Sequence, residues 1–449
     1  MRIVHALGWY FPDSLGGTEV YVDGLCRRQL RAGHRVAVAA PDAGATAERV
    51  YAHHDVPVYR YPIPAVPTRA EAQGLVPVRG AERFHAWLRG QRPTIVHFHG
   101  FVTGLGLHEV RAAAGAGART VLTNHLPGLG FLCRRGTLMR WGRRPCDGVC
   151  RPAKCAACVL QQKGLPRPLA DAIGVLTSPV SGALGRLSGP IGTGLGLNAS
   201  IRRDQAHQKE LMALLDAFVV LNRRAAAIIG ANGLPDEAVV VNRLGVSQTG
   251  LVPKPGPDRR PSVAPITVGF LGRIDPTKGP DVLVRAVTRL AADLPLRVEI
   301  RGPVSGPAGT RYLRALQAAA AGDPRVTVGP PLAPDEVGAV LARYDLLCCP
   351  SLWFENGPTV AIEAQAVGTP VIASRIGALP ELIDDGVNGR LFDAGDEGAL
   401  AAILNEVART PAGTIDRWRL ALPPARTMDA IAADYEALYT RLAAVPRAS

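Results

Sequence analysis

The sequence has no long apolar segment. The longest, residues 211–221, has 11 residues and includes the charged Asp216, whereas a membrane-spanning helix needs about 20 apolar residues. The apolar start, residues 1–7, is too short for a secretory signal, and Asp13 follows soon after it. We therefore expect a cytoplasmic protein whose only contact with a membrane is peripheral, at the inner face.

Acidic residues are nearly absent from residues 125–167. This segment has nine arginines or lysines and one acid, Asp147, so it contributes +8 of the net charge of +13. Aromatic side chains are also scarce there, with Phe131 and Trp141 alone. No nucleic-acid-binding motif accompanies the charge, so we expect no nucleic-acid partner. The segment is either a solvated basic loop or a surface for a phosphate-bearing molecule or an anionic bilayer.

The G-x-G-x-x-G fingerprint of dinucleotide binding is absent, yet the first half alternates strand and helix patterns. The predicted strands are residues 2–7, 35–40, 94–99, 119–125, 216–222 and 238–241, and the predicted helices are residues 18–31, 105–114 and 223–230. Strands that alternate with helices form a parallel sheet with helices on its faces. An α/β fold is therefore expected.

The chain of 449 residues is too long for one hydrophobic core. Residues 253–265 contain five prolines, which is typical of an interdomain linker. After it the alternation starts again, with predicted strands at residues 266–271, 297–301, 325–328 and 345–349, a helix at 280–290 and a last amphipathic helix at 428–442. The sequence thus predicts a second α/β domain.

Residues 351–393 carry the strongest functional pattern. Within them, Glu355 and Glu363 lie eight positions apart. Pro358, between them, suits the first turn of a helix, which we expect to end before Gly368. Free amides at the start of this helix, beside two carboxylates, suit a polyhydroxylated ligand that is attached to a phosphate.

This pattern resembles the Glu-x7-Glu signature of retaining glycosyltransferases, and the motifs that follow are similar to those of glycosyltransferase family 4. These motifs are Gly368 to Ser374, Gly377, Glu381, Asp385-Gly386 and Asn388-Gly389. The resemblance implies the GT-B fold, in which two Rossmann-like parallel-sheet domains face each other across a cleft. An N-terminal acceptor-side domain would occupy residues 1–250, a linker 251–265 and a donor-binding domain 266–424. The last residues, 425–449, would form a helix that crosses back to the N-terminal domain.

The resemblance implies roles for the two glutamates. Glu363 would bind the ribose hydroxyls of a nucleoside-diphosphate sugar, and Glu355 would hold hydroxyls of the sugar. The turn that follows Glu355 would supply further donor contacts through Asn356, Gly357, Pro358 and Thr359. Asn356 stands where the family often has glycine, which leaves the identity of the donor sugar open.

Two cations belong to a GR…KG pattern that resembles the family's diphosphate-binding loop. They are Arg273 and Lys278, and both follow a predicted strand. By resemblance they would neutralise the departing diphosphate, which makes them candidate catalytic residues together with Glu355. They would replace the metal that other transferases use, so no cofactor would be required for catalysis.

Candidate site residues also occur in the first half. The pair Gly16-Gly17 resembles the family's opening motif, where glycine lets the backbone approach a phosphate or sugar closely. His125 resembles the family's active-site histidine near the donor sugar, and the alternative is a structural histidine. His97 and His99 share one face of a predicted strand, and the deeper His97 is expected to be structural.

Five of the eight cysteines cluster within 26 residues. They are Cys133, Cys146, Cys150, Cys155 and Cys158. In a cytoplasmic chain such a cluster favours a metal over disulfides, and any four of the thiolates can close a tetrahedral site. A structural zinc ion, an iron–sulfur cluster and unligated redox thiols are the alternatives. We expect the cluster to form an insert of the N-terminal domain at about residues 131–165.

The patterns together predict a retaining glycosyltransferase that moves a sugar from a nucleoside-diphosphate sugar to a hydroxyl group. The acceptors that are common in the family, together with the basic segment, favour a polysaccharide or a lipid-linked glycan as acceptor. Two alternatives remain. One is a nucleotide-sugar epimerase of the same fold, and the other is a noncatalytic ligand-binding or redox-sensing protein built on the cysteine cluster.

Overall fold

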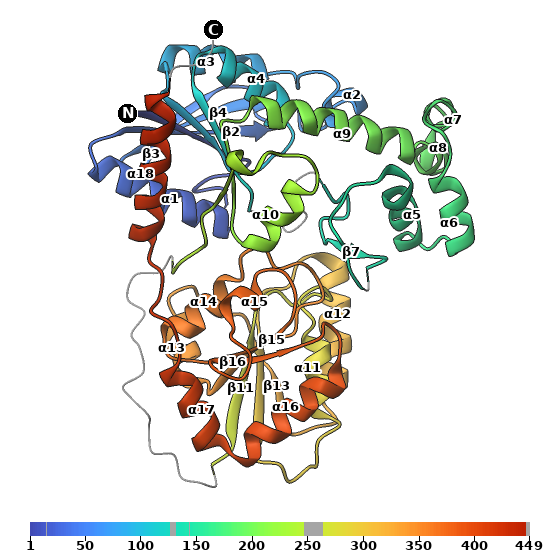
Figure 1. Cartoon of the computed structure of the whole chain (residues 1–449), viewed down its shortest axis with the longest axis vertical. Coiled ribbons are helices and arrows are strands. Elements are labelled where there is room, and N and C mark those ends of the chain that lie inside the picture. Colours follow the sequence, from blue (N-terminus) through green and yellow to red (C-terminus); the bar gives the residue numbers. More distant parts are fainter. Residues whose placement is uncertain (15, 126–131, 143, 247–263, 446–449) are drawn as a thin grey trace. The chain divides into compact units, whose positions relative to one another are not determined.

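The computed structural model describes residues 1–14, 16–125, 132–142, 144–246 and 264–445. The chain divides into two compact units (Figure 1). The first unit comprises Met1–Gly142, Cys146–Ser247 and Thr427–Ser449, and the second comprises Arg143–Pro145 and Gln248–Arg426. The predicted linker, residues 251–265, lies outside the described residues except for its last two positions.

The first unit is built on an eight-stranded sheet of order β10-β9-β6-β5-β1-β2-β4-β3. The strands are β1 Arg2–Ala6, β2 Arg35–Ala43, β3 Arg49–His53, β4 Val56–Ile63, β5 Ile95–Phe98, β6 Arg119–Thr123, β9 Ala217–Val220 and β10 Val239–Val241. All neighbours pair in parallel except β3 and β4. The helices that accompany the sheet are α1 Gly17–Arg31, α2 Arg69–Ala72, α3 Ala81–Gln91, α4 Leu107–Gly115, α10 Arg223–Gly230 and α18 Met428–Ala444.

One face of this sheet is covered by α1 and α18, which lie side by side in Figure 1 although they stand at opposite ends of the sequence. Ile3 of β1, Ile95 of β5 and Val121 of β6 belong to one buried cluster with Leu25 of α1 and Ile431 of α18. Side chains two positions apart on a strand share a face. The same face therefore continues, toward the carboxyl ends of the strands, into a set of histidines described below.

A helical region that the sequence patterns did not predict follows the cysteine segment. Its helices are α5 Pro152–Gln162, α6 Arg167–Gly174, α7 Ser178–Leu184, α8 Gly189–Leu195 and α9 Leu197–Leu214, and a two-stranded sheet of β7 Met139–Arg140 and β8 Arg144–Pro145 precedes them. Figure 1 shows α6, α7 and α8 at the end of α9 that lies away from the sheet. None of the described helices is long and apolar enough to cross a membrane.

The second unit contains a six-stranded parallel sheet of order β13-β12-β11-β14-β15-β16. The strands are β11 Ile266–Leu271, β12 Leu296–Arg301, β13 Val326–Val328, β14 Leu346–Cys349, β15 Val371–Ser374 and β16 Gly389–Phe392. The helices are α11 Pro280–Val287, α12 Gly306–Ala320, α13 Val337–Arg343, α14 Thr359–Ala366, α15 Leu379–Leu382, α16 Glu397–Arg409 and α17 Pro411–Leu420. Two parallel-sheet units with helices on their sheets confirm the predicted α/β class.

Candidate active site

The best-defined polar group of the second unit is the Glu355 carboxylate, in the loop between β14 and α14. Its Oε1 atom accepts three hydrogen bonds, from Lys278 Nζ at 2.8 Å, Ser351 Oγ at 2.5 Å and Trp353 Nε1 at 2.9 Å. The side chain is buried, and three donors on one oxygen fix its orientation. The structure therefore brings together Lys278 and Glu355, which are 77 positions apart in the sequence.

Arg273 and Lys278 both lie in the loop that joins β11 to α11. Because β11 and β14 are neighbours in a parallel sheet, this loop and the Glu355 loop leave the same edge of the sheet. The Trp353 ring lies 5.5 Å from the Arg273 guanidinium and 5.1 Å from Lys278 Nζ, within the range of cation–π contact. Arg273 is half-exposed, with its Nε 3.4 Å from Asp275. This edge thus presents an accessible guanidinium beside a fixed ammonium group.

Glu363 lies on α14, one turn after the start of the helix, and is buried. Burial raises the pKa of its carboxyl group to about 7, because removing water disfavours the charged form. Pro358 forms the N-cap of the helix. The Thr359 amide donates to the Gly357 carbonyl at 3.0 Å. That amide, one of those expected to contact a ligand, is therefore used within the turn.

Gly377 holds the backbone of the Glu355 loop in place. It has φ +61°, and a Cβ atom on it would lie 2.2 Å from the Glu355 carbonyl oxygen. The next residue, Ala378, donates its N–H to the same oxygen at 2.7 Å. Only glycine fits both the conformation and the close approach, so the glycine of the family-like motif is explained by the position of Glu355.

The described residues of the first unit contain a chain of hydrogen-bonded histidines across three neighbouring strands. His5 Nδ1 lies 2.9 Å from His99 Nε2, and His99 Nδ1 lies 3.1 Å from His125 Nε2. At the other end, His5 Nε2 lies 2.8 Å from Oε1 of Gln29 on α1. His125 is half-buried and His5 and His99 are buried. The predicted site residue His125 is thus connected to the inside of the unit.

A second set of hydrogen bonds joins His97 to α18. His97 Nδ1 lies 2.5 Å from the Tyr439 hydroxyl, and its Nε2 lies 2.7 Å from Thr123 Oγ1, which also bonds the Tyr435 hydroxyl at 2.7 Å. The nitrogens of His5, His97 and His99 are close enough to hold a metal ion. All six of them already have hydrogen-bond partners, however, which favours a polar network over a metal centre.

The histidines are neutral at ordinary pH. Burial lowers the pKa of His5 and of His125 to about 4 and holds the pKa of His97 and His99 well below 6.5. A neutral ring has one N–H group and one acceptor nitrogen. Because Gln29 Oε1 can only accept, His5 and His99 both donate from Nε2. His125 then also donates from Nε2, which leaves its Nδ1 as an acceptor.

The glycine pair of the first unit lies at the start of α1. Gly16 is the N-cap and Gly17 the first helical residue. A Cβ atom on Gly16 would lie 2.4 Å from Glu19 Oε2, while one on Gly17 would meet no atom within 4 Å. Glu19 itself accepts a hydrogen bond from Ser14 Oγ at 2.7 Å. Space around Gly17 is therefore open, whereas a side chain at Gly16 would displace the Glu19 carboxylate.

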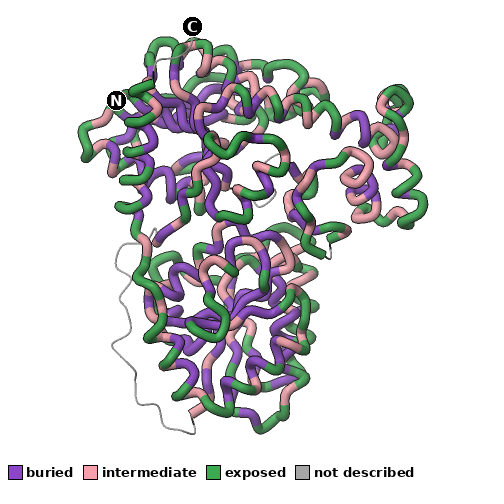
Figure 2. The backbone as a smooth tube through the Cα atoms, viewed as in Figure 1, coloured by how far each residue is buried: buried purple, intermediate pink, exposed green. Residues whose placement is uncertain are grey.

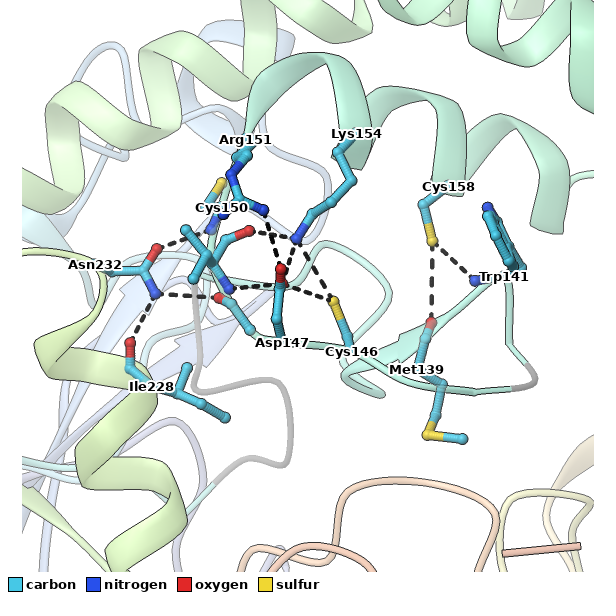
Figure 3. Close-up of polar contacts among 12 residues, drawn as sticks. Met139, Trp141, Cys146, Asp147, Cys150, Arg151, Lys154, Cys158, Ile228 and Asn232 are labelled. Carbon is cyan, nitrogen blue, oxygen red and sulfur yellow. Dashed lines mark hydrogen bonds and ion pairs between the residues drawn. The ribbon is translucent and has the colours of Figure 1, made fainter.

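The five clustered cysteines line one small cavity of about 40 Å³ in the first unit, and none of them forms a disulfide. No three of their sulfur atoms lie within 4.8 Å of one another in the described structure. Figure 3 shows Lys154 and Asp147 beside Cys146. The sulfur of Cys158 accepts a hydrogen bond from the backbone N–H of Trp141 at 3.1 Å.

Two of these thiols, Cys150 and Cys155, interact. The interaction with the Cys150 thiol lowers the pKa of Cys155 below its ordinary value and raises the pKa of Cys150. Cys155 is thereby stabilised as a thiolate, the form that binds metals and reacts with oxidants.

Several residues of these networks were not predicted from the sequence, among them Ser351, Trp353, His5 and Gln29. Ser351 and Trp353 precede Glu355 by four and two positions, and this proximity was the only signal available. His5 lies in the first predicted strand and Gln29 in the first predicted helix, where each was treated as part of a periodic pattern. Their function as hydrogen-bond partners depends on tertiary contacts.

Comparison with known families defines the class of the protein. Residues 15–171 match the family described as "Glycosyltransferase Family 4", and residues 258–419 match "Glycosyl transferases group 1". The first match runs through the cysteine segment. The chain belongs to glycosyltransferase family 4 and has the GT-B fold, as the sequence motifs predicted.

The curated relatives are similar over a part of their length. A D-inositol 3-phosphate glycosyltransferase from Corynebacterium efficiens is 41% identical over 141 residues, 30% of this chain and 33% of the relative. The enzyme of the same name from Mycolicibacterium smegmatis is 36% identical over 178 residues, 37% of this chain and 39% of the relative. The chain thus spans about a third of the length of the curated relatives it matches.

Solved structures agree over nearly the whole chain, at low identity. Sucrose-phosphate synthase from Thermosynechococcus elongatus has a TM-score of 0.64 at 18% identity and covers 98% of this chain and 99% of its own. Anabaena HepE in complex with UDP and glucose has a TM-score of 0.59 at 15% identity and covers 98% and 100%. The catalytic domain of starch synthase IV from Arabidopsis thaliana, bound to ADP and acarbose, has a TM-score of 0.60 at 16% identity and covers 99% of each chain. These likenesses establish the fold.

Proposed function

We propose that the protein is a retaining glycosyltransferase that moves a sugar from a nucleoside-diphosphate sugar to a hydroxyl acceptor. The observation that carries the proposal is the Glu355 carboxylate, held by Lys278, Ser351 and Trp353 at a strand-end edge of the second unit. Ligands of open parallel sheets bind outside the carboxyl ends of the strands. Solved neighbours of the same fold contain UDP with glucose, or ADP, by their titles.

The mechanism uses the two cations as electrostatic catalysts. The bond between the anomeric carbon and a diphosphate oxygen breaks, and negative charge develops on the diphosphate next to Arg273 and Lys278. The acceptor oxygen attacks the anomeric carbon on the face from which the diphosphate departs, and the acceptor proton passes to the departing oxygen. Because the two cations stabilise this charge, the reaction needs no catalytic metal.

The remaining site residues bind and orient the donor. The two carboxylates are acceptors, so Glu363 suits the ribose hydroxyls and Glu355 suits sugar hydroxyls, assisted by the turn from Asn356 to Thr359. In the first unit, the acceptor nitrogen of His125 suits a further hydroxyl of the donor sugar, and Gly17 leaves its backbone accessible. We propose a polysaccharide or lipid-linked glycan as acceptor and a cytoplasmic location. Because two relatives are D-inositol 3-phosphate glycosyltransferases, D-inositol 3-phosphate should also be tested as an acceptor.

Thermal unfolding with UDP, GDP, ADP and their sugars, with and without magnesium, tests the proposal. A ligand at a hundredfold excess over its dissociation constant stabilises the folded state by about 2.7 kcal/mol. We expect one diphosphate to raise the melting temperature without magnesium, and Lys278→Gln to abolish the rise. Lys209→Gln, at an exposed position of the first unit, is the control.

Two outcomes would contradict the transferase. Conversion of the donor sugar without any acceptor would favour an epimerase. No response to any diphosphate, together with ligand binding that changes on oxidation of the thiols, would favour the redox-sensing alternative.

We further propose that the cysteine cavity holds a structural zinc ion. The Cys155 thiolate and the N–H donor to Cys158 suit a metal thiolate site, and the sulfurs would have to draw together to the zinc–sulfur distance of about 2.3 Å. Metal analysis should find one zinc per chain. Among five Cys→Ser variants, four should lose the zinc, and the fifth serves as the control. Iron with sulfide, or no metal in any preparation, would contradict zinc.

A further inference from the structure

Residues 167–199 form three tandem repeats of 11 residues, read as RPLADAIGVLT, SPVSGALGRLS and GPIGTGLGLNA. The second position is always proline, the third a large aliphatic residue and the eighth glycine. These positions are Pro168, Pro179 and Pro190, then Leu169, Val180 and Ile191, then Gly174, Gly185 and Gly196. Each repeat is one short helix, because α6, α7 and α8 begin at the first position of their repeats.

The repeated glycines and the fourth positions are explained by packing inside this region. A Cβ atom on Gly196 would lie 2.7 Å from the Cα of Gly185, and one on Gly174 would lie 2.7 Å from the Ala153 carbonyl oxygen. The fourth positions, Ala170, Ser181 and Gly192, are buried in all three repeats. The repeats therefore pack closely through their small residues.

The third positions are not explained by this packing. Leu169 is 52% exposed, Val180 47% and Ile191 72%, although each lies next to a buried residue. Val175 and Leu187, between the helices, are exposed as well. Figure 2 shows exposed and intermediate backbone along most of this region. The same exposed aliphatic position recurs in three consecutive helices, and exposed apolar patches mark surfaces that bind proteins, membranes or ligands.

Positive charge accompanies these side chains. Residues 167–203 contain four arginines and one acid, Asp171. A cavity of about 490 Å³ beside α7, α8 and α9 is lined by Arg69, Arg134, Arg186 and Arg203.

Two of these arginines are already engaged, while two are not. Arg134 is paired with Asp204 at 2.7 Å, and Arg69 donates to the Gly185 carbonyl at 3.3 Å. Arg186 and Arg203 have no acidic partner in the described part of the chain, so they are available for anions.

We infer that α6, α7 and α8 form a docking surface for an anionic lipid bilayer. The third-position side chains enter the interface between headgroups and acyl chains, and the arginines bind lipid phosphates. Charge complementarity favours this occupant over a second copy of the basic chain. The inference is independent of the proposed transfer reaction, since bilayer binding requires no donor or acceptor.

Vesicle co-sedimentation of the full chain tests the docking surface. We expect binding to vesicles of phosphatidylglycerol, little binding to phosphatidylcholine, and weaker binding at high salt because exposed charges are screened. The triple variant Leu169→Ser, Val180→Ser, Ile191→Ser should lower binding at least about tenfold, since each side chain loses its transfer into an apolar phase. The double variant Arg186→Gln, Arg203→Gln should lower it about tenfold, at roughly 1 kcal/mol per arginine.

The matched control replaces three exposed valines of the same unit outside the repeats, Val50→Ser, Val66→Ser and Val76→Ser. It should bind as the unchanged protein does. Equal binding to neutral vesicles, or full binding by the triple variant, would overturn the inference. So would the absence of vesicle binding together with a dimer that the triple variant dissociates, because the surface would then belong to a second copy. Failure of the proposed transferase reaction would leave all these results unchanged.

Discussion

The Glu363 carboxyl group is buried, so the free energy of unfolding of the second unit depends on whether this group is charged. Its pKa of about 7 exceeds the ordinary value of 4.5, so the folded chain keeps this proton more tightly than the unfolded chain. The free energy of unfolding therefore falls as pH rises from about 4.5 through 7. Between pH 5 and 8 the protein should lose about 2 kcal/mol relative to Glu363→Gln, measured by urea unfolding.

A suitable control for this prediction is Glu336→Gln, at an exposed position of the same unit. Its stability should follow that of the unchanged protein at every pH. If the curves of the unchanged protein and Glu363→Gln run parallel, the carboxyl group of Glu363 does not titrate between pH 5 and 8.

The direction of the histidine chain depends on a single acceptor, Gln29 Oε1. Gln29→Glu keeps an acceptor in that place, whereas Gln29→Met removes it and releases the rings into both tautomers. Nitrogen-15 spectra should show His125 protonated at Nε2 in the unchanged protein and in Gln29→Glu, and mixed in Gln29→Met. Transfer activity should fall up to about tenfold in Gln29→Met, the equivalent of one hydrogen bond.

The order of transfer activity in the two Gln29 variants shows whether Gln29 orients the histidine rings or only fills space in the core. A buried position that serves packing alone would tolerate methionine better than a new carboxylate. Tyr61→Phe, which removes a buried hydroxyl that donates to the Gly104 carbonyl, is a control that should leave the His125 tautomer unchanged. His125 protonated at Nδ1 in the unchanged protein would contradict the assigned direction.

At the scale of elements, the loop of Glu355 depends on the turn that contacts it. Gly377→Ala places a Cβ against the Glu355 carbonyl and strains a left-handed residue, so we expect a loss of about 3 kcal/mol in the free energy of unfolding and weaker diphosphate binding. Gly386→Ala is the matched control, because Gly386 has φ +83° with nothing within 4 Å of the added atom. It should cost only about 1 kcal/mol, by urea unfolding. Equal losses in both would mean that the contact with Glu355 is unimportant.

Ten strands of the two sheets could be predicted because their patterns are local, whereas β3, β4, β15 and β16 were not predicted. Strand β11 and helix α10 have the predicted bounds, residues 266–271 and 223–230, and the predicted strand at 94–99 is β5, Ile95–Phe98. Apolar runs between glycine and proline signals suffice for such elements. The contacts of His5 with His99, 94 positions away, are set by the order of the strands, which no local pattern contains.

The helices α6 to α8 were missed for a different reason. Each has seven or eight residues and contains glycine, so none shows a long amphipathic period. The available signal was the spacing of Pro168, Pro179 and Pro190, since proline favours the first turn of a helix. The spacing of 11 residues between these prolines is visible in the sequence alone.

At the scale of the whole molecule, the last helix belongs to the first unit. Ile431 of α18 is fully buried in the cluster that contains Ile3 and Leu25. Ile431→Ala should therefore lower the stability of the first unit by about 3 kcal/mol, through lost burial and a cavity. Hydrogen exchange followed by mass spectrometry should accelerate in β1 and β5 and stay unchanged in residues 266–425.

Arg441→Ala is the control for this change, since Arg441 is exposed on the same helix. It should leave exchange in both units as it is. Acceleration in the second unit upon Ile431→Ala would mean that the two units unfold together.

The return of α18 to the first unit also sets an order of assembly. A ribosome synthesises the chain from its first residue, so the strands of the first sheet emerge long before the helix that covers them. Every element of the second unit, which ends at Arg426, is therefore synthesised before Met428 and the rest of α18. Domains generally fold as units, and the second unit needs no segment that follows Arg426. The first unit must wait, with the histidines of its sheet uncovered, until synthesis has passed Tyr435 and Tyr439.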